Sequence, residues 1–197
     1  LEEDWFFQAL VECYLPLLNT LEKSSRAKEQ SPKLTIGLSP TLLSLLEDEI
    51  LKRRFKKWIE IRLEILISAK KDHREASLHL TNHLKNNLKS WESCNQNLIS
   101  RFSKLESLKV VDIITCAATH GYLPLLRDNP ATVRAQLRTA VNEHKRLFNK
   151  APMGIWLPEC AYYEGLDELM IESGLRYAVL DGHGLLNANP RPRYGLY

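Results

Sequence analysis

Four short runs of mostly apolar residues divide the chain, and none of them alternates strictly between apolar and polar positions. A continuous apolar run is typical of a strand that is covered on both faces. The runs lie at 33–38, 109–115, 154–157 and 177–180. Because the segments between them carry apolar residues at helical spacing, we predict an α/β fold in which these four strands are parallel neighbours.

The segment before the first run has the pattern of an amphipathic helix. Apolar residues line one face over 3–22, and Pro16 lies within that face. Proline has no N–H to donate and clashes with the preceding turn, so we expect a kink or a break at this point.

Between the first two runs, the pattern predicts a long helical hairpin. Ser39 and Pro40 provide an N-cap and a first-turn proline for a helix that begins near Thr41. Apolar positions continue at helical spacing to about residue 70, and a heptad-like series occupies 84–105. We therefore expect an antiparallel hairpin over 41–105, inserted between two strands of the sheet.

Two more helices are expected in the second half of the chain. Asn129 and Pro130 begin a helix that runs to about Asn149, and Gly174 ends a shorter one over 166–173. The expected buried face of the first consists of Val133, Leu137, Val141 and Leu147.

Composition excludes several classes of protein. The 197 residues are 44% hydrophobic and 26% charged, with a net charge of +3, which is the profile of one ordinary globular domain. The Lys and Arg residues are spread along helices, so no nucleic acid partner is expected. No apolar run approaches the ~18 residues of a membrane helix, and the N-terminus lacks a signal-peptide pattern.

The four cysteines also bear on location. Cys13, Cys94, Cys116 and Cys160 are far apart and form no metal-binding pair. We interpret them as reduced thiols of a cytoplasmic protein that binds neither metal nor cofactor. Both chain ends look cut, which suggests a piece of a larger enzyme.

The strongest candidate for chemistry is Glu159, in the stretch GIWLPECAY at 154–162. Pro158 cannot continue the strand, so the carboxylate emerges at the strand's C-terminal end, which faces the active site in parallel α/β folds. Trp156, Tyr162 and Tyr163 are large aromatic neighbours of the kind that stack on sugar rings.

The stretch WLPECAY resembles the nucleophile motif of glycoside hydrolase family 57, in the form found in its α-glucan branching enzymes. A second block, IITCAATHGYLPLL at 113–126, resembles the preceding family motif, in which a strand ends in a histidine, here His120. The resemblance extends over the whole chain. It implies that the protein is part of a catalytic (β/α) barrel, seven-stranded in the complete family, which is incomplete and distorted in this chain.

The resemblance also implies the site. Glu159 is expected to be the nucleophile of a retaining reaction on an α-1,4-glucan, and His120, Trp156, Asp181 and His183 are expected to bind substrate. Two family motifs are missing: an early His-x-His and the motif with the acid/base aspartate. They would belong to the remainder of the catalytic domain.

Asp181 and His183 lie in the sequence DGHG, just after the last predicted strand. The glycines would let the backbone approach a ligand closely, and both polar side chains would face the same rim. A metal site would need more ligands, so we favour contacts with sugar hydroxyls.

Three functions are compatible with this sequence. The preferred one is a 1,4-α-glucan branching enzyme of glycogen-type synthesis. The second is an α-amylase or 4-α-glucanotransferase on the same fold. The third is a glucan-binding protein without catalysis. The hairpin over 41–105 could serve as a lid, a subunit contact or a glucan-binding edge, or be purely structural.

Overall fold

The computed structural model describes residues 1–26, 33–69 and 73–190, and it divides into two compact units. The first unit comprises Leu1–Leu34 and Ser44–Asp112, and the second comprises Thr35–Leu43 and Ile113–Tyr197. Each unit has its own core. None of the described helices is long and apolar enough to cross a membrane.

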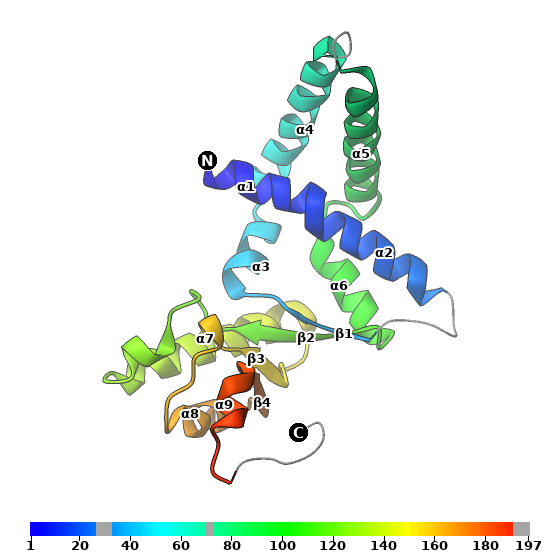
Figure 1. Ribbon diagram of the computed structural model, residues 1–197. Coiled ribbons are helices and arrows are strands. Elements are labelled where there is room, and N and C mark those ends of the chain that lie inside the picture. The colour runs from blue at the N-terminus through cyan, green and yellow to red at the C-terminus, as the bar shows by residue number, and fades with distance from the viewer. Residues whose placement is uncertain (27–32, 70–72, 191–197) are drawn as a thin grey trace. The chain divides into compact units, whose positions relative to one another are not determined.

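The four predicted strands are present and form one sheet in the order β1-β2-β3-β4 (Figure 1). Their bounds are Leu34–Gly37, Val111–Cys116, Gly154–Trp156 and Tyr177–Val179. Strand β3 pairs in parallel with β2 and with β4. On the other side of β2, the N–H of Leu38 donates to the carbonyl of Ile114 at 3.0 Å. The parallel neighbourhood predicted for these strands is confirmed.

Helices α7 (Pro130–Phe148) and α8 (Leu166–Glu172) pack with the sheet to form the core of the second unit. Their expected ends are confirmed: the Asn129 side chain accepts from the Thr132 N–H at 3.2 Å, and Gly174 has φ +81°. The expected buried face was wrong at one position. Phe148 is buried and Leu147 is only half-buried, because Phe148 lies seven residues, or two turns, after Val141 and so shares its face, whereas Leu147 does not. The core residues include Leu123, Val133, Leu137, Val141, Ile155, Leu157, Leu166 and Met170.

Gly154 begins β3 directly beneath the ring of Tyr177 on β4. A Cβ atom at Gly154 would lie 2.3 Å from the Tyr177 Cε2 and Cζ atoms, so only glycine allows this packing. The ring of Tyr177 therefore packs on β3, the strand that leads to the turn with Glu159.

We expect Gly154→Ala to lower the free energy of unfolding by about 1 to 2 kcal/mol, because the ring must move off the strand. Urea unfolding would measure the loss. Gly182→Ala is the matched control, since a Cβ there meets no atom within 4 Å. Equal stability of the two variants would contradict the packing argument.

The first unit is helical. Helix α1 (Glu2–Ala9) passes through a π-helical turn (Leu10–Tyr14) into α2 (Leu15–Ser25). After β1 come α3 (Pro40–Glu47), α4 (Glu49–Ala69), α5 (Arg74–Ser93) and α6 (Leu98–Ser107). Helices α4 and α5 run side by side in opposite directions (Figure 1). They enclose an aromatic cluster of Phe7, Phe55, Trp58 and Trp91.

The hairpin expected over 41–105 is more broken than predicted. The first helix is interrupted at Asp48, whose carboxylate accepts from the N–H groups of Ile50 and Leu51, each at 2.8 Å, and so begins a new helix. The second is interrupted at 94–97, where Asn95 and Gln96 have positive φ and Asn97 caps α6. Side-chain caps compete with helix continuation at both places.

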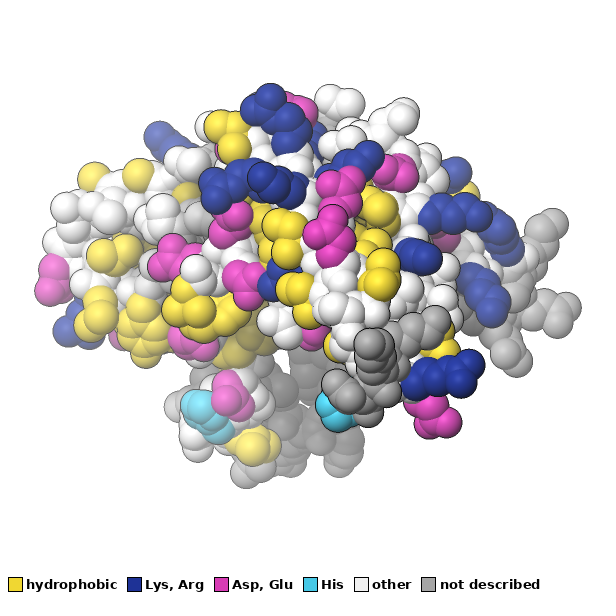
Figure 2. Space-filling view, turned by 90° about the horizontal axis from the view of Figure 1, so that it is seen from above, with side chains coloured by type: hydrophobic (Ala, Val, Ile, Leu, Met, Phe, Trp, Pro, Cys, Tyr) yellow, Lys and Arg dark blue, Asp and Glu magenta, His cyan; other side chains and the backbone are white. Residues whose placement is uncertain are grey.

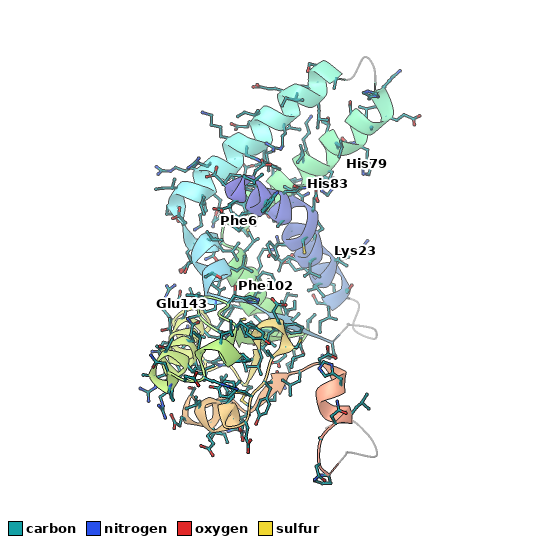
Figure 3. The ribbon with its side chains drawn as sticks, turned by 60° about the vertical axis from the view of Figure 1, so that its left-hand side comes forward. Phe6, Lys23, His79, His83, Phe102 and Glu143 are labelled. Carbon is teal, nitrogen blue, oxygen red and sulfur yellow. The ribbon has the colours of Figure 1, made fainter. Side chains whose placement is uncertain are left out.

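The π-helical turn is a consequence of Pro16. In this turn the Leu15 N–H donates to the Leu10 carbonyl, five residues back. In the same register the Val11 carbonyl would accept from residue 16, but Pro16 has no N–H to donate. Two side chains of α5 replace that donor: His83 Nε2 lies 2.9 Å from the Val11 oxygen and Asn87 Nδ2 lies 3.0 Å from it. Figure 3 shows His83 on α5 as it passes the first helices of the chain. The irregularity expected at Pro16 is thus a π-helical turn, and its free carbonyl connects α5 to the α1–α2 segment through side-chain hydrogen bonds.

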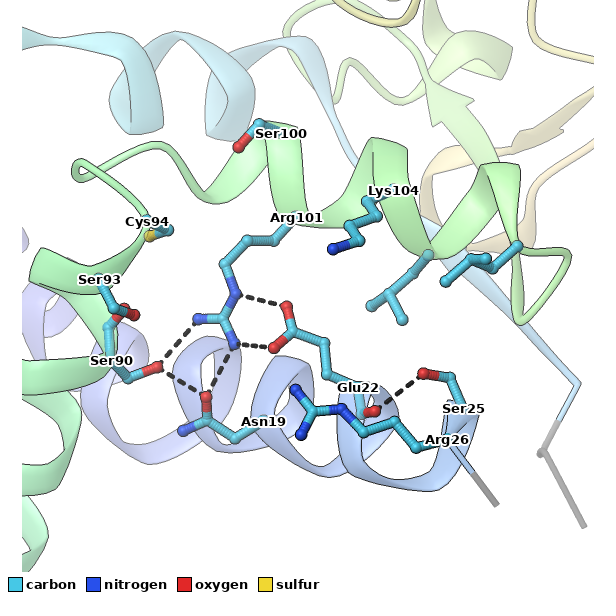
Figure 4. A pocket seen from close by; sticks show the side chains of 12 residues that line it. Asn19, Glu22, Ser25, Arg26, Ser90, Ser93, Cys94, Ser100, Arg101 and Lys104 are labelled. Carbon is cyan, nitrogen blue, oxygen red and sulfur yellow. Dashed lines mark hydrogen bonds and ion pairs between the residues drawn. The ribbon is translucent and has the colours of Figure 1, made fainter. Parts of the chain in front are cut away.

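Arg101 of α6 lies at the centre of a polar network in the first unit (Figure 4). It is 8% exposed and donates to both carboxylate oxygens of Glu22, at 2.7 and 2.9 Å. It also donates to Asn19 at 2.8 Å and to Ser90 at 3.0 Å. The network joins α2, α5 and α6 beside a hollow of about 460 Å³.

Surface charge is mixed on the face shown in Figure 2. Lys and Arg side chains are interspersed with Asp and Glu, and small groups of apolar side chains lie between them. Such interspersed charge is the pattern of a solvated surface.

Candidate active site

The predicted site residues follow the C-terminal ends of three neighbouring strands in the second unit. Cys116, Trp156 and Val179 are paired across β2, β3 and β4, so these strands end side by side. His120 comes shortly after the end of β2, Glu159 after the end of β3 and Asp181 after the end of β4. All three therefore belong to the same edge of the sheet, where parallel α/β folds place their ligands.

Glu159 occupies a tight turn that its residue type does not favour. The turn is closed by the Cys160 N–H, which donates to the Leu157 carbonyl at 2.8 Å. Pro158 fits the turn with its fixed φ, but Glu159 has φ +52° and Cys160 has φ +55°. Left-handed backbone costs about 1 to 3 kcal/mol at a residue with a side chain, and such strain can persist at a functional site when the surrounding structure holds it. The turn presents the Glu159 side chain to solvent, with 75% of it exposed.

His120 also has a left-handed backbone, with φ +56°. Its N–H donates to the Ala117 carbonyl at 2.9 Å, which closes the turn after β2. Gln136 of α7 clamps this turn through a reciprocal pair: its amide oxygen accepts from the Thr119 N–H at 2.9 Å, and its amide nitrogen donates to the Thr119 hydroxyl at 2.8 Å. The backbone of His120 is therefore held from α7.

A chain of three side chains connects the ends of β2 and β3. The His120 Nε2 atom lies 3.3 Å from the Glu159 Oε1 atom, and the His120 Nδ1 atom lies 3.2 Å from the sulfur of Cys116. Burial raises the pKa of the Cys116 thiol to about 11, so it is a neutral S–H at physiological pH. The sequence analysis did not identify Cys116 or Gln136 as site residues. The only signal for Cys116 was its position four residues before His120.

The remaining predicted site residues are not hydrogen-bonded to these three side chains within the described part of the structure, although Trp156 is the strand partner of Cys116. Trp156 ends β3 with 39% of its surface exposed, beside Gly37 of β1, where a Cβ atom would be 3.8 Å from the Trp156 Cβ. Asp181 and His183 contact each other at 3.1 Å, and among the described residues no hydrogen bond joins either of them to Glu159 or His120.

The DGHG sequence lies at the start of a short helix, α9 (Gly182–Leu186), where the His183 N–H faces the Asp181 carboxylate at 3.5 Å. Two aromatic neighbours of Glu159 make contacts of their own. Tyr162 donates to Asp167 at 2.9 Å, and Tyr163 packs against the core of the second unit.

No metal centre is apparent within residues 1–26, 33–69 and 73–190, which hold no group of three or more His, Cys, Asp or Glu side chains arranged to bind an ion. The site is instead a single exposed carboxylate with a histidine donor. An exposed carboxylate of this kind can attack an electrophilic carbon.

Removing the side chain at Glu159 should relieve the backbone strain of its turn. We expect Glu159→Gly to raise the free energy of unfolding by about 1 kcal/mol. This figure is the strain energy that is relieved in the folded state, reduced by the entropy that glycine adds to the unfolded chain. Urea unfolding would measure the gain. Glu164→Gly is the control, because Glu164 is not among the residues with positive φ and should lose stability. A loss in both variants would contradict a strained Glu159.

Comparison with known proteins gives a consistent result. The family model described as Glycosyl hydrolase family 57 matches residues 1–197. The 1,4-alpha-glucan branching enzyme TK1436 of Thermococcus kodakarensis is 34% identical, over 95% of this chain and 30% of its own length. The chain therefore spans about a third of the length of this curated relative.

Solved structures agree in fold. The alpha-amylase AmyC of Thermotoga maritima superposes with a TM-score of 0.90 at 31% identity, covering 100% of this chain and 38% of its own. A GH57-type branching enzyme of Pyrococcus horikoshii superposes with a TM-score of 0.88 at 32% identity, covering 96% and 39%. The two sequence motifs, the shared fold and the match over the whole chain lead to one assignment: the chain belongs to glycosyl hydrolase family 57.

Proposed function

We propose that the protein containing this chain is a retaining 1,4-α-glucan branching enzyme whose nucleophile is Glu159. The observation that carries the proposal is the Glu159 carboxylate, which is exposed on a strained turn at the C-terminal edge of a parallel sheet and lies 3.3 Å from His120 Nε2. Relatives that are named branching enzymes favour this reaction among those that a carboxylate nucleophile can perform.

In the proposed reaction, a Glu159 oxygen attacks the anomeric carbon of an α-1,4-linked glucosyl unit as the glycosidic C–O bond breaks. The departing oxygen takes a proton from an acid that belongs to the rest of the catalytic domain. A 6-hydroxyl of another glucan then displaces Glu159 and forms the α-1,6 bond, and its proton goes to the conjugate base of the acid that protonated the departing oxygen. His120 donates to one carboxylate oxygen and leaves the other free to attack.

The other predicted residues take supporting roles in this proposal. The exposed face of Trp156 stacks on a glucosyl ring, and Asp181 and His183 hydrogen-bond sugar hydroxyls. The four strands are part of a seven-stranded barrel whose remaining strands lie outside this chain, and the helices over 41–105 are an insertion in it. The four cysteines are free thiols, which accords with the cytoplasmic location that we propose.

The second candidate is hydrolysis, as in an α-amylase, and the superposition on AmyC at a TM-score of 0.90 favours it. The two reactions share the glycosyl intermediate and differ in whether water or a sugar hydroxyl resolves it.

Incubation of the complete protein with amylose distinguishes these functions. Proton NMR counts α-1,4 and α-1,6 anomeric signals, and a reducing-sugar assay counts new chain ends. Branching yields α-1,6 signals with few new reducing ends, whereas hydrolysis yields reducing ends alone. Retention of amylose without either product and without any change in its chain lengths would identify a binding protein and refute both enzymatic proposals, whereas altered chain lengths alone would indicate a 4-α-glucanotransferase.

A further inference from the structure

We propose that Cys116 is a positioning residue that sets the tautomer of His120. In this tautomer the proton is on Nε2, and the Nε2–H group donates a hydrogen bond to Glu159. The inference rests on the proposed function for its catalytic meaning, but its structural content is independent of it. Neither recognised motif points to a role for this cysteine.

The Glu159 carboxylate favours a proton on the ring nitrogen that faces it, and Cys116 acts on the other nitrogen. Glu159 Oε1 is only an acceptor, and it faces His120 Nε2 at 3.3 Å. If Nε2 were unprotonated, its lone pair would face the carboxylate oxygen of Glu159, and the two acceptors would repel each other. In the neutral imidazole, a proton on Nε2 leaves Nδ1 as a lone pair.

Cys116 completes the arrangement from the other side of the ring. Its sulfur lies 3.2 Å from Nδ1, within hydrogen-bond range for sulfur. Cys116 is 3% exposed at the end of β2, and the burial that raises its pKa to about 11 keeps it a neutral thiol. A thiol is a weak donor and a weak acceptor, but with Nε2–H turned toward Glu159 the thiol proton can be donated to the Nδ1 lone pair. It therefore favours the form of the ring that has a lone pair on Nδ1.

Within the described residues, the ionisable groups in contact with the His120 ring are Cys116 and Glu159. Gln136 and Thr119 hold the backbone of its turn and carry no charge. The two hydrogen bonds together fix the rotation of the ring as well as its tautomer, because a flipped ring would lose both. His120 then engages Oε1 of Glu159 and leaves Oε2 to form the bond with the anomeric carbon.

The test uses the complete protein with ¹⁵N-labelled histidine, since the nitrogen shifts of a histidine ring distinguish its tautomers. We expect the wild-type His120 to show a protonated Nε2 and an unprotonated Nδ1 at neutral pH. In Cys116→Ala only Glu159 still favours the Nε2 proton, so the preference weakens and a measurable fraction with protonated Nδ1 appears. Cys116→Ser should restore the wild-type pattern, because a hydroxyl donates to Nδ1 as a thiol does. Cys13→Ala, at an exposed cysteine, is the control.

Kinetics add a second readout. We expect kcat to fall about tenfold in Cys116→Ala with little change in KM, the effect of losing one orienting hydrogen bond, and the serine variant to recover most of it. A wild-type His120 with its proton on Nδ1, or an unchanged tautomer in a folded Cys116→Ala, would overturn the inference. NMR detects both of these outcomes without any glucan. If the protein had no activity on glucan, the proposed function would be refuted, and the test of the tautomer would still be valid.

Discussion

Glu159→Gln is expected to reduce the transfer of α-1,4-linked glucan chains by several powers of ten, as happens when a catalytic nucleophile is removed. The amide keeps the shape of the side chain and still accepts a hydrogen bond from His120, but it cannot form a glycosyl ester. Glucan binding should persist, because the exposed ring of Trp156 contributes independently of the charge. New α-1,6 linkages on amylose measure transfer, and retardation in amylose-containing gels measures binding.

Azide provides the decisive control for this variant. It should enter the space left by the nucleophile and give a glycosyl azide of inverted configuration. Glu164→Gln, at an acidic residue in the loop that follows the turn, should retain full activity. Undiminished branching by Glu159→Gln would mean that the turn is structural and that another carboxylate performs the chemistry.

Glu22→Ala is expected to lower the free energy of unfolding by about 3 kcal/mol. The substitution leaves the guanidinium of Arg101, only 8% exposed, without its bidentate partner, and an unpaired buried charge is among the costliest defects in a fold. Asn19 and Ser90 remain as acceptors but carry no charge. Urea unfolding followed by the fluorescence of Trp58 and Trp91 would report on this unit.

The double variant Glu22→Leu with Arg101→Met should recover most of the loss, since removing both charges also removes the penalty for burying them. Glu92→Ala is the control, because its ion pair with Lys56 is about half exposed and should contribute nothing measurable. If Glu22→Ala were as stable as Glu92→Ala, water would have to reach Arg101, and the network would not be buried in solution.

The strands were predictable because their signal is local. Each strand lies in a mostly apolar run, and some runs are followed by a residue that stops a strand, such as Pro158 after β3. The helix interruptions were not predictable from periodicity, because Asp48 and Asn97 act through caps that leave the apolar spacing intact. The buried position in the last turn of α7 was predictable, because Phe148 continues the spacing of Leu137, Val141 and His144.

The site was predictable only where a motif carried it. Glu159 and His120 were identified from two separate blocks, and the structure brings them to 3.3 Å. The contacts of Cys116 and Gln136 depend on how β2 and α7 approach the turn after β2, and no pattern along the chain encodes them. The short helix after β4 escaped prediction because two glycines in five residues argue against a helix.

The Val11 carbonyl has a consequence for how this sequence can evolve. Pro16 creates the need for an outside donor, and His83 and Asn87 meet it from α5, more than sixty residues away. Replacement of Pro16 by a residue with an N–H would make both side chains dispensable, whereas their loss alone would leave a carbonyl unsatisfied. The three positions should therefore covary among relatives, and proline at 16 should be accompanied by a side-chain donor on α5.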